Sequence, residues 1–373
     1  MTNRSLHIVS LDVPYPADYG GVIDIFYKIK SLKEEGVDVH LHCFAYGERG
    51  EQQELEQYCK TVHYYARKTG LASNLSLTPY ITYSRRSREL LDNLNADRFP
   101  ILFEGIHSVY VLLRRQLGDR VLLLRSHNIE HDYYQHLANR EPDVVKRLFF
   151  QVEAYRLKRL LTKLPPDLPI AAISPADTNY LQGQFVNTFW LPPFHSNAAV
   201  ETLPGRGDYA LYHGNLSVSE NQEVAEMLIA SFKNREIRLI IAGKAPSGGL
   251  RQSAERSTNI RLIADPEASQ MDALLRHAHV ILLPTFQPTG IKLKLIESLY
   301  RGRFCVANRM MVANTRLEDL VTVEEDDFYA CTERLMRRSV SAADIERRRR
   351  TLDVHYNNAR NARAIMEKVN PPV

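Results

Sequence analysis

A chain of 373 residues is longer than a single compact core usually spans, so two domains are expected. An apolar fraction of 44% and a charged fraction of 25% are ordinary for a globular protein, and a net charge of +4 is too small to indicate a nucleic-acid-binding protein. No apolar run approaches the roughly eighteen residues of a transmembrane helix, and the run near the N-terminus is too short for a signal peptide. None of the four cysteines forms a C-x-x-C pair, which disfavours a metal or redox motif and suits a reducing cytosol.

The N-terminal part of the chain alternates between strand and helix patterns. Helical spacing of apolar residues predicts one helix over 20–35 and a longer one over 142–163. The apolar residues on one side of the longer helix are Val145, Leu148, Phe149, Val152, Tyr155 and Leu160. Short apolar runs predict strands at 6–11, 37–44, 100–103, 121–124 and 170–173. Strands that alternate with helices indicate right-handed crossovers and a parallel sheet.

A change of composition between Leu191 and Asp208, where prolines and glycines replace any helical period, indicates the connection between two domains. Beyond it, strands are predicted at 209–213, 238–242, 260–263, 280–283 and 304–307. The tail over 342–369 has one long charged helical pattern with four consecutive arginines, for which a solvated face is the ordinary interpretation and a phosphate or membrane-surface role the alternative. The fold class is therefore α/β, with two doubly wound domains whose ligands bind at the carboxyl ends of the strands.

The strand expected at 280–283 leads into the stretch of greatest chemical interest. A loop rich in proline and threonine follows it, and a helix begins near Gly290. The first turn of a helix has unpaired N–H groups and a partial positive charge, so it binds anions, and a glycine there lets a phosphate approach closely. Lys292 and Lys294 oppose the dipole of an isolated helix, but a bound anion would reverse that balance.

Glu297 lies seven residues after Gly290, about two helical turns further on and nearly on the same face. A carboxylate at that position can accept two hydrogen bonds from the hydroxyls of a ribose. A phosphate site followed by a diol site is the layout of a nucleotide. The alternative interpretation is an ordinary helix start with exposed lysines and a solvated glutamate.

This stretch resembles the donor-site signature of retaining family 4 glycosyltransferases of the GT-B fold, G-x-G-I-K-x-K-x-x-E-A, in the run PTFQPTGIKLKLIESLYRGRFCVAN. Further stretches resemble other motifs of that family in the same order, namely PYPADYGG, RSHNIEHDYY, YHGNLSVSENQEVAEML and IIAGKAP. The resemblance covers nearly the whole chain. It implies two Rossmann-like domains facing across a cleft, with a C-terminal helix crossing back to the N-terminal domain. The implied boundaries are 1–194 for the N-terminal acceptor-side domain, 195–207 for the linker, 208–345 for the nucleotide-sugar domain and 346–373 for the closing helix.

The resemblance also implies roles for individual residues. Backbone N–H groups near Gly290 would hold the pyrophosphate, Glu297 would bind the ribose, and His127 would lie against the donor sugar. The segment 263–265 would line the base pocket. The implied donor-binding residues are Gly20, Gly21, Asn215, Lys244, Asp265, Gly290, Ile291, Lys292, Leu293 and Glu297. The catalytic candidates are His127, Glu104 and Lys294, and the acceptor-binding candidates are Tyr15, Asp18, Tyr19, His107 and Glu130.

Some of these candidates have a second interpretation. Glu104 is either an acceptor-side base or an acid at a helix N-terminus. Tyr15, Asp18 and Tyr19 either form an acceptor wall or are simply turn residues. The cluster around His127 either contacts substrate or caps local structure, and its H-N-I-E-H spacing is not a known metal motif.

The chain departs from the family pattern at two places. Thr289 occupies the position of the acid that usually contacts hydroxyls of the donor sugar. Asn215, with Glu220 or Asn221, stands where the family often has two basic residues. The lysines that could replace these charges are Lys244, Lys292 and Lys294.

We therefore expect a retaining glycosyltransferase that moves a sugar from a nucleoside-diphosphate sugar to a glycan or lipid-linked hydroxyl acceptor, in polysaccharide or lipid-linked glycan synthesis. No D-x-D motif is present, so neither a metal nor another cofactor is expected. The expected location is the cytoplasm, with peripheral contact to an anionic membrane at its inner face through residues such as Arg85, Arg86 and Arg88. The alternatives are a nucleotide-sugar epimerase of the same fold and a non-catalytic nucleotide-sugar-binding partner.

Overall fold

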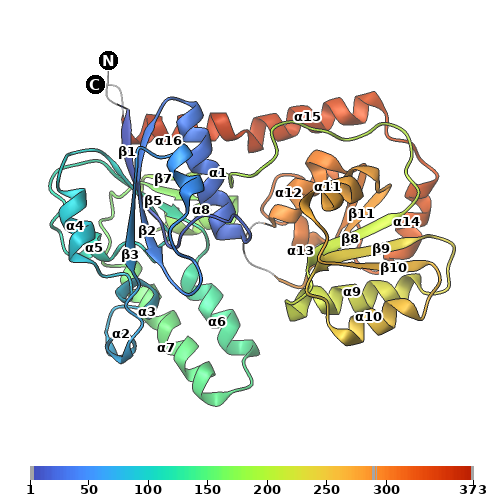
Figure 1. Cartoon of the computed structure of the whole chain (residues 1–373), viewed down its shortest axis with the longest axis horizontal. Helices are drawn as coiled ribbons and strands as arrows, with labels where there is room; N and C mark the ends of the chain where they lie inside the picture. The colour runs from blue at the N-terminus through green and yellow to red at the C-terminus, as the bar shows by residue number, and fades with distance from the viewer. Residues whose placement is uncertain (1–3, 288–289, 291, 371–373) are drawn as a thin grey trace. The chain divides into compact units, whose positions relative to one another are not determined.

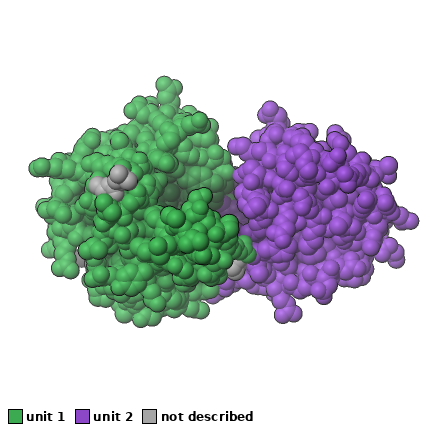
Figure 2. All heavy atoms as spheres, turned by 90° about the horizontal axis from the view of Figure 1, so that it is seen from below, with its two compact units in different colours: residues 1–195, 356–373 green, residues 196–355 purple. Residues whose placement is uncertain are grey.

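The computed structural model of the chain describes residues 4–287, 290 and 292–370. It contains two compact units, each built around one parallel sheet with helices packed against it (Figures 1 and 2). Unit 1 comprises Met1–His195 and Tyr356–Val373, and unit 2 comprises Ser196–His355. Within the described residues, no helix is both long and apolar enough to cross a membrane.

The sheet of unit 1 has its strands in the order β3-β2-β1-β4-β5-β6-β7, all paired in parallel. Their bounds are β1 Ser5–Val9, β2 Asp38–Ala45, β3 Thr61–Ala66, β4 Ile101–Glu104, β5 Leu122–Ser126, β6 Ile170–Ala172 and β7 Thr188–Trp190. Two of these strands, β3 and β7, are not indicated by apolar runs. Both lie at the edges of the sheet, where side chains are mostly half-buried and an apolar run is not required.

Helices form a hydrophobic core on each face of this sheet. Their bounds are α1 Gly20–Glu34, α2 Leu71–Leu75, α3 Tyr80–Tyr83, α4 Arg88–Leu94, α5 Tyr110–Leu113, α6 Glu130–Arg140, α7 Val144–Leu161, α8 Pro175–Gln182 and α16 Asn358–Val369, with a 3₁₀ helix at Gln53–Gln57. In one core Ile25 of α1 joins Ile365 of α16. In the other Leu94 of α4 joins Leu157 of α7. The C-terminal helix is therefore an integral part of unit 1.

The charged tail is two helices instead of the single one expected over 342–369. They are α15 Ala342–Tyr356 and α16. The side chain of Asn357, between them, accepts a hydrogen bond from the backbone N–H of Arg360 at 2.9 Å. This contact caps a new helix start, which the periodicity of apolar residues does not reveal.

The long helix α7 is present, but the apolar side that the sequence shows is not the buried side. The helix packs against α6 and the sheet through Glu153, Ala154, Leu157, Leu160 and Leu161. Of the apolar residues predicted on one side, those exposed are Val145, Leu148, Val152 and Tyr155. The buried carboxylate of Glu153 is satisfied, because the backbone N–H of Tyr80 donates to it at 2.7 Å and Arg156 pairs with it at 2.8 Å.

The sheet of unit 2 has its strands in the order β10-β9-β8-β11-β12-β13, again all parallel. The strand bounds are β8 Ala210–Asn215, β9 Leu239–Lys244, β10 Ile260–Ala264, β11 Val280–Leu283, β12 Phe304–Ala307 and β13 Thr322–Val323. The helices are α9 Ser219–Phe232, α10 Gly248–Glu255, α11 Ala268–His277, α12 Leu293–Arg301, α13 Arg309–Val312 and α14 Phe328–Met336, with a 3₁₀ helix at Glu318–Leu320. The first five strands lie where the sequence predicts them.

In both sheets the strand order reverses beside the first strand of the unit, between β1 and β4 in unit 1 and between β8 and β11 in unit 2. Loops diverge at such a point, and ligands of doubly wound sheets bind at the carboxyl ends of the strands there. The predicted site residues follow β1, β4 and β5 in unit 1 and the four strands β8 to β11 in unit 2. In each unit the candidate residues therefore lie together at the carboxyl ends of the strands.

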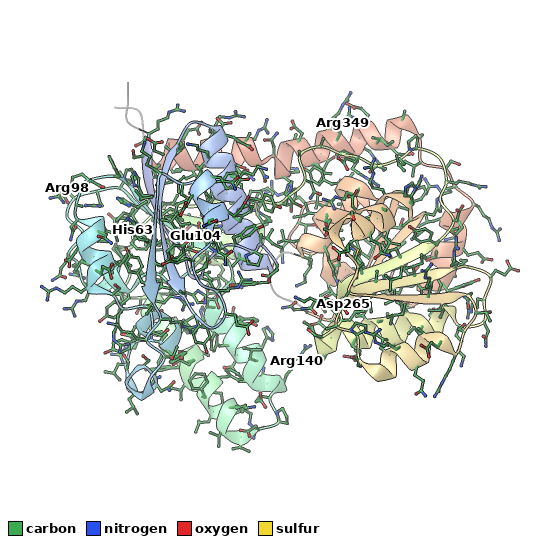
Figure 3. The ribbon with its side chains drawn as sticks, in the orientation of Figure 1. His63, Arg98, Glu104, Arg140, Asp265 and Arg349 are labelled. Atoms are coloured by element: carbon green, nitrogen blue, oxygen red, sulfur yellow. The ribbon has the colours of Figure 1, made fainter. Side chains whose placement is uncertain are left out.

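Four histidines lie on one face of the unit 1 sheet, and their strands pair in register (Figure 3 labels His63). They are His7, His40, His42 and His63. The Nδ1 of His7 lies 2.9 Å from the Nε2 of His42, and Asp97 lies 3.0 Å from the Nε2 of His7. Burial lowers the pKa of His7 and His40, and it lowers the pKa of His42 well below its ordinary value. The folded protein therefore favours the neutral form of His7, His40 and His42.

We expect the free energy of unfolding to fall as the pH drops below about 6.5, the pKa of an unperturbed histidine. Below that pH the histidines of the unfolded chain bind protons, whereas the same histidines buried in the folded protein stay neutral, so acid favours unfolding. A fully buried histidine such as His42 contributes a loss of roughly 1.4 kcal/mol near pH 5.5. Urea unfolding near pH 7.5 and pH 5.5 measures this, and His42→Gln should flatten the dependence while His136→Gln, at an exposed position of α6, should not. Equal stability at both pH values would contradict the expectation.

Candidate functional site

In unit 2, loops after neighbouring strands bring candidate donor residues to one edge of the sheet. Asn215 ends β8, Lys244 ends β9 and Asp265 follows β10 (Asp265 is labelled in Figure 3). The Oδ1 of Asp265 accepts a hydrogen bond from the backbone N–H of Ala245 at 2.8 Å, which joins two of these loops. The Oδ1 of Asn215 accepts hydrogen bonds from the N–H and the hydroxyl of Ser217 at 3.1 and 2.7 Å, which closes the turn after β8.

Helix α12 begins at Leu293, after the loop that follows β11. Lys292 is its N-cap residue in an extended conformation, and in the described part of this helix no side chain caps the first turn and no acid lies in it. Gly290 has a φ of +72°, a left-handed conformation that favours glycine. Ile291, another candidate donor residue, lies outside the described residues. The first turn of α12 thus offers backbone N–H groups at the position where helices bind anions.

Two lysine side chains lie at this end of α12. Burial lowers the pKa of both Lys292 and Lys294 to about 8, and the nearby Glu220 opposes that shift. The Nζ of Lys294 lies 5.4 Å from the centre of the Tyr212 ring, and the Nζ of Lys292 donates to the carbonyl of Gly290 at 3.3 Å. Partly desolvated ammonium groups are unfavourable unless they are compensated, so an anion bound here would be stabilised.

Glu220 is a residue that sequence reasoning did not assign to the site. It lies in the first turn of α9, and its Oε1 accepts hydrogen bonds from the hydroxyl of Thr285 and the N–H of Phe286, both at 3.0 Å. It therefore holds the start of the loop that leads to α12, and it is the acid whose charge acts on both lysines. An acid in the first turn of the helix after β8 was visible in the sequence. Its partners could not be predicted, because Thr285 and Phe286 follow β11 instead.

Glu297 lies on α12, where its Oε1 pairs with Arg301 at 3.2 Å, and Arg301 also pairs with Asp272 at 3.2 Å. Burial raises the pKa of Glu297, Arg301 lowers it, and Asp272 raises it further. Hydrogen bonds donated by hydroxyl groups would stabilise the ionised form of such a partly desolvated carboxylate.

A buried contact fixes α12 against the sheet. The hydroxyl of Ser298 donates to the carbonyl of Lys294 at 2.7 Å, so it accepts the N–H of His213 Nε2 at 3.0 Å. Burial lowers the pKa of His213 to about 3, so this imidazole is neutral and can donate from Nε2. The first turn of α12 is thereby held to β8, at the point where the strand order reverses.

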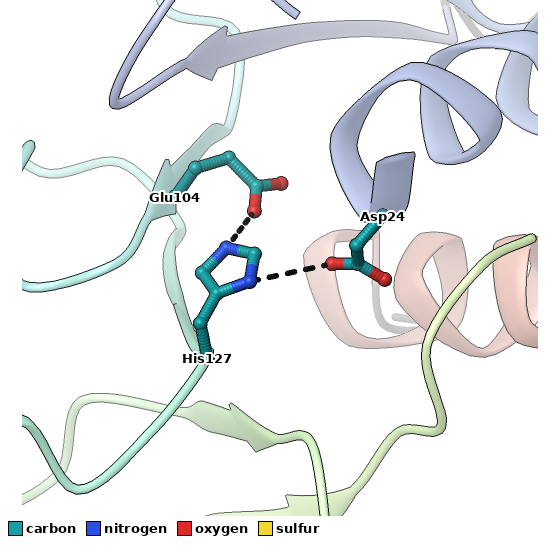
Figure 4. A group of neighbouring side chains, drawn as sticks. All are labelled: Asp24, Glu104 and His127. Carbon is teal, nitrogen blue, oxygen red and sulfur yellow. Dashed lines mark hydrogen bonds and ion pairs between the residues drawn. The ribbon is translucent and has the colours of Figure 1, made fainter. Parts of the chain in front are cut away.

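In unit 1, two catalytic candidates belong to a buried cluster of charges. Figure 4 shows His127 between the carboxylates of Glu104 and Asp24. The Nε2 of His127 lies 2.9 Å from Glu104, and its Nδ1 lies 3.8 Å from Asp24. Lys28 bridges the two carboxylates, at 2.9 Å from Asp24 and 2.7 Å from Glu104. Arg125 pairs with Asp24 at 3.1 Å.

Lys28 and Arg125 balance the two carboxylates of this cluster, while the buried Nδ1 of His127 has no hydrogen-bond partner among the described residues. Burial alone would raise the pKa of Glu104, but Lys28 and His127 lower it overall, so Glu104 is an ionised carboxylate that orients His127. Asp24, Glu104 and His127 present atoms that bind metals, all within 4.8 Å. Two cationic side chains already neutralise the two carboxylates, however, so a divalent ion would add uncompensated charge and the donor set does not fit one. The sequence analysis did not predict Asp24 as a member of this cluster. The signal was visible, because Asp24 and Lys28 lie four residues apart among the apolar positions of α1.

The acceptor-side candidates after β1 differ in exposure: Asp18 and Tyr19 are exposed, whereas Tyr15 is half-buried. The hydroxyl of Tyr19 donates to Asp12 at 2.9 Å, while Arg49 pairs with Asp18 and lies 5.1 Å from the centre of the Tyr19 ring. Tyr15 instead packs against Phe26, with the ring centres 5.4 Å apart. Gly20 and Gly21 follow directly and start α1.

Two further candidates follow β4 and β5. Glu130 starts α6, and burial raises its pKa to about 7. It lines a cavity of about 20 Å³ together with His127, which is room for about one water molecule. His107 is partly buried, and its pKa lies well below the ordinary value because of burial and the positive charge of Arg85.

One residue of the expected membrane contact, Arg85, is wrong, whereas Arg88 is exposed at the start of α4 and contact through it stays a prediction. Arg85 is only 5% exposed, and its guanidinium donates to the carbonyls of Leu11, at 2.7 Å, and of Ile81. Arg86 lies 4.1 Å from the centre of the Tyr83 ring and donates to the hydroxyl of Ser73. These arginines hold loops together, so they are not a free basic surface.

Comparisons with known proteins bear on the fold and the class of protein. Residues 207–338, which include the unit 2 site, match a family model described as glycosyl transferases group 1. A protein of Klebsiella pneumoniae described as "Uncharacterized 44.6 kDa protein in cps region" is 26% identical over 352 residues, which is 87% of this chain and 88% of that protein.

Two solved structures resemble nearly the whole chain. HepE of Anabaena, in complex with UDP and glucose, has a TM-score of 0.63 at 11% identity and covers 99% of this chain and 100% of its own. The apo form of the lipopolysaccharide outer core galactosyltransferase WaaB has a TM-score of 0.64 at 11% identity and covers 98% of both chains. The chain has the GT-B fold. This confirms the expected fold class, with two Rossmann-like units.

The GT-B fold and the matched family together support a glycosyltransferase. The match to glycosyl transferases group 1 spans every donor-site candidate of unit 2, from Asn215 to Glu297. The segment that matches the family model is also the one in which the structure places the start of α12, two lysines and a half-buried glutamate.

Proposed function

We propose that this GT-B protein is a retaining glycosyltransferase that moves a sugar from a nucleoside-diphosphate sugar to a hydroxyl acceptor. One observation carries the proposal. The uncapped start of α12 has Lys292 and Lys294 beside it and Glu297 two turns along, at the edge of a sheet where the strand order reverses. That arrangement suits a diphosphate followed by a ribose.

In this proposal each group of the unit 2 site has one task. The first N–H groups of α12 and the two lysines bind the diphosphate, and Glu297 accepts hydrogen bonds from the ribose hydroxyls. Asp265 and its neighbours border the base, while Lys244, at the exposed end of β9, adds positive charge. The loop that Glu220 holds sets the distance between β11 and the start of α12.

We propose a front-face reaction. The acceptor oxygen bonds to the anomeric carbon on the side from which the diphosphate leaves, the bond from that carbon to the phosphate oxygen breaks, and the acceptor proton passes to that oxygen. The product keeps the anomeric configuration. The negative charge that develops on the leaving diphosphate is met by the lysines and the helix start, a preorganised field that does not require a metal ion.

In unit 1 we propose that Glu104 acts through His127. The carboxylate of Glu104 accepts a hydrogen bond from Nε2–H of His127. This contact keeps the imidazole in one orientation at the carboxyl end of β5, against the transferred sugar. The similarity to a protein of a cps region motivates a role in polysaccharide synthesis, with a glycan or lipid-linked acceptor at the cytoplasmic side of a membrane.

A non-catalytic nucleotide-binding protein is the second candidate. The observation that favours it is Glu220, an acid beside the lysines where the resemblance leads one to expect a basic residue. Incubation with the nucleotide sugar that binds best separates the two candidates, because only the enzyme releases nucleoside diphosphate when an acceptor is present.

A thermal-shift screen of UDP-, GDP-, ADP- and dTDP-sugars tests the proposed site. A ligand at about a hundred times its dissociation constant stabilises the folded state by about 2.7 kcal/mol, which raises the melting temperature. The shift should shrink strongly in Lys292→Gln/Lys294→Gln and persist in the control Lys233→Gln, which alters an exposed lysine of the same unit.

The pH dependence of this shift gives a second readout. A bound diphosphate raises the pKa of both lysines above the value of about 8 that they have alone. Affinity should therefore be full below pH 8 and decline as the pH rises through and above 8. No stabilisation by any of the four nucleotide sugars would contradict the proposed function.

A further inference from the structure

Helix α7 exposes a continuous apolar stripe to solvent. Its members are Val144, Val145, Leu148, Val152 and Tyr155, which are 38% to 77% exposed. At 100° per residue they occupy an arc of about 100° on one side of the helix, opposite the side that packs into unit 1. Single exposed apolar residues are normal, but a contiguous stripe of this kind indicates a docking surface.

A separate loop extends this apolar surface. Leu75 and Leu77 are 82% and 80% exposed. The loop is fastened along α7, because Arg156 donates to the carbonyl of Asn74 at 3.1 Å and the N–H of Tyr80 reaches Glu153. Figure 1 shows α2, at the start of this loop, beside α7.

The exposed charges within α7 all have one sign, and one exposed acid, Asp143, caps the first turn of the helix. The exposed charged residues of α7 are Lys146, Arg147, Lys158 and Arg159. The acid of this helix, Glu153, is buried and paired with Arg156 at 2.8 Å. At 100° per residue, Arg147, Lys158 and Arg159 lie beside or within the apolar stripe, whereas Lys146 lies on the opposite side of the helix. An apolar stripe bordered by three cations of α7 is the pattern of a helix that lies in the interface of an anionic membrane.

We propose that α7, with Leu75 and Leu77, docks unit 1 onto an anionic lipid bilayer. The apolar stripe would enter the boundary between headgroups and acyl chains, and the flanking cations would contact anionic headgroups. At about 1.5 Å per residue, the 18 residues of α7 lie along roughly 27 Å of surface. This surface replaces Arg85 as the expected contact, and it does not depend on the proposed glycosyl transfer.

The cationic rim favours a membrane over a second copy of the chain. A two-fold contact places the same patch on both partners, so three cations from each copy would share one interface with only Asp143 of each copy to balance them. An anionic bilayer offers charge of the opposite sign to the three cations beside the stripe at once.

Co-sedimentation of the full chain with vesicles tests the proposal. The chain should sediment with vesicles of phosphatidylcholine and phosphatidylglycerol, and much less with phosphatidylcholine alone. Leu148→Glu/Val152→Glu should weaken binding at least tenfold, because it places charge on the apolar stripe. Arg147→Gln/Lys158→Gln should weaken it by about fivefold for each cation removed.

Two control variants match these changes elsewhere on the molecule. Val186→Glu alters an apolar residue that is 79% exposed outside this surface, and Arg349→Gln/Arg350→Gln alters two exposed arginines of α15 (Arg349 is labelled in Figure 3). Both should bind anionic vesicles like the unaltered chain. Absence of binding to anionic vesicles, equal binding by Leu148→Glu/Val152→Glu, or a dimer in solution that this variant dissociates would each overturn the proposal.

Discussion

Replacement of Lys294 by glutamine is expected to lower kcat/KM for sugar transfer by about a hundredfold to a thousandfold. Lys294 lies in the first turn of α12, where burial lowers its pKa to about 8 and the Tyr212 ring lies against its ammonium group. A positioned cation in a partly dry site stabilises charge on a leaving diphosphate far more than a solvated lysine does. Release of nucleoside diphosphate, measured with the nucleotide sugar that stabilises the protein best, gives the rate.

Three comparisons make this result specific. Lys244→Gln removes an exposed lysine from the end of β9 and should have a smaller effect, and Lys233→Gln should have none. Ser298→Ala removes the hydroxyl that joins His213 to the first turn of α12, so it should lower kcat/KM less than Lys294→Gln does. A Lys294→Gln protein with nearly unaltered kcat/KM would show that this lysine does not stabilise the transition state.

Replacement of Asp24 by alanine is expected to lower the free energy of unfolding by about 3–5 kcal/mol. Asp24 is fully buried, and its carboxylate binds Lys28 at 2.9 Å, Arg125 at 3.1 Å and the N–H of Phe194 at 2.8 Å. Burial alone would raise its pKa, but Arg125 and Lys28 lower it overall. Its loss leaves Lys28 paired with Glu104 and leaves the buried Arg125 with backbone carbonyls in place of a carboxylate.

Denaturant unfolding followed by circular dichroism measures this loss. The matched control is Glu346→Ala, which removes an acid that pairs with two exposed arginines of α15 and should change stability by less than about 1 kcal/mol. An equally small effect of Asp24→Ala would mean that the buried cluster is not a tightly coupled network.

Much of the fold follows from sequence pattern because parallel strands between helices are continuous apolar runs. The strands β8 to β12 and β1, β2, β4, β5 and β6 all lie at predicted positions. The edge strand β3 escaped prediction because it carries His63 and Tyr64 on a half-buried surface. The pattern of apolar runs therefore predicts the central strands of a sheet better than the strands at its edges.

The buried side of α7 could not be chosen from the sequence. The helix has apolar residues on two sides, Leu157 and Leu161 on one and Leu148 and Val152 on the other. Periodicity detects both sides equally, and only the packing of α6 and the loop before Tyr80 decides which one is covered.

Contacts between distant residues also limited prediction of the site. The α12 candidates were visible because they lie within eight positions of one another in one strand–loop–helix unit. The pairing of Lys28 with Glu104 joins α1 to β4 across 76 positions, and Glu220 meets Thr285 across 65 positions. A single sequence carries no signal for either contact.

The central claim is that the start of α12 receives a nucleoside diphosphate. A crystal structure of the protein with the nucleotide that stabilises it best tests this most directly. We predict diphosphate oxygens within hydrogen-bonding distance of the first N–H groups of α12 and of Lys294, with ribose hydroxyls on Glu297. A nucleotide bound elsewhere, with Glu297 still paired only to Arg301, would contradict the claim.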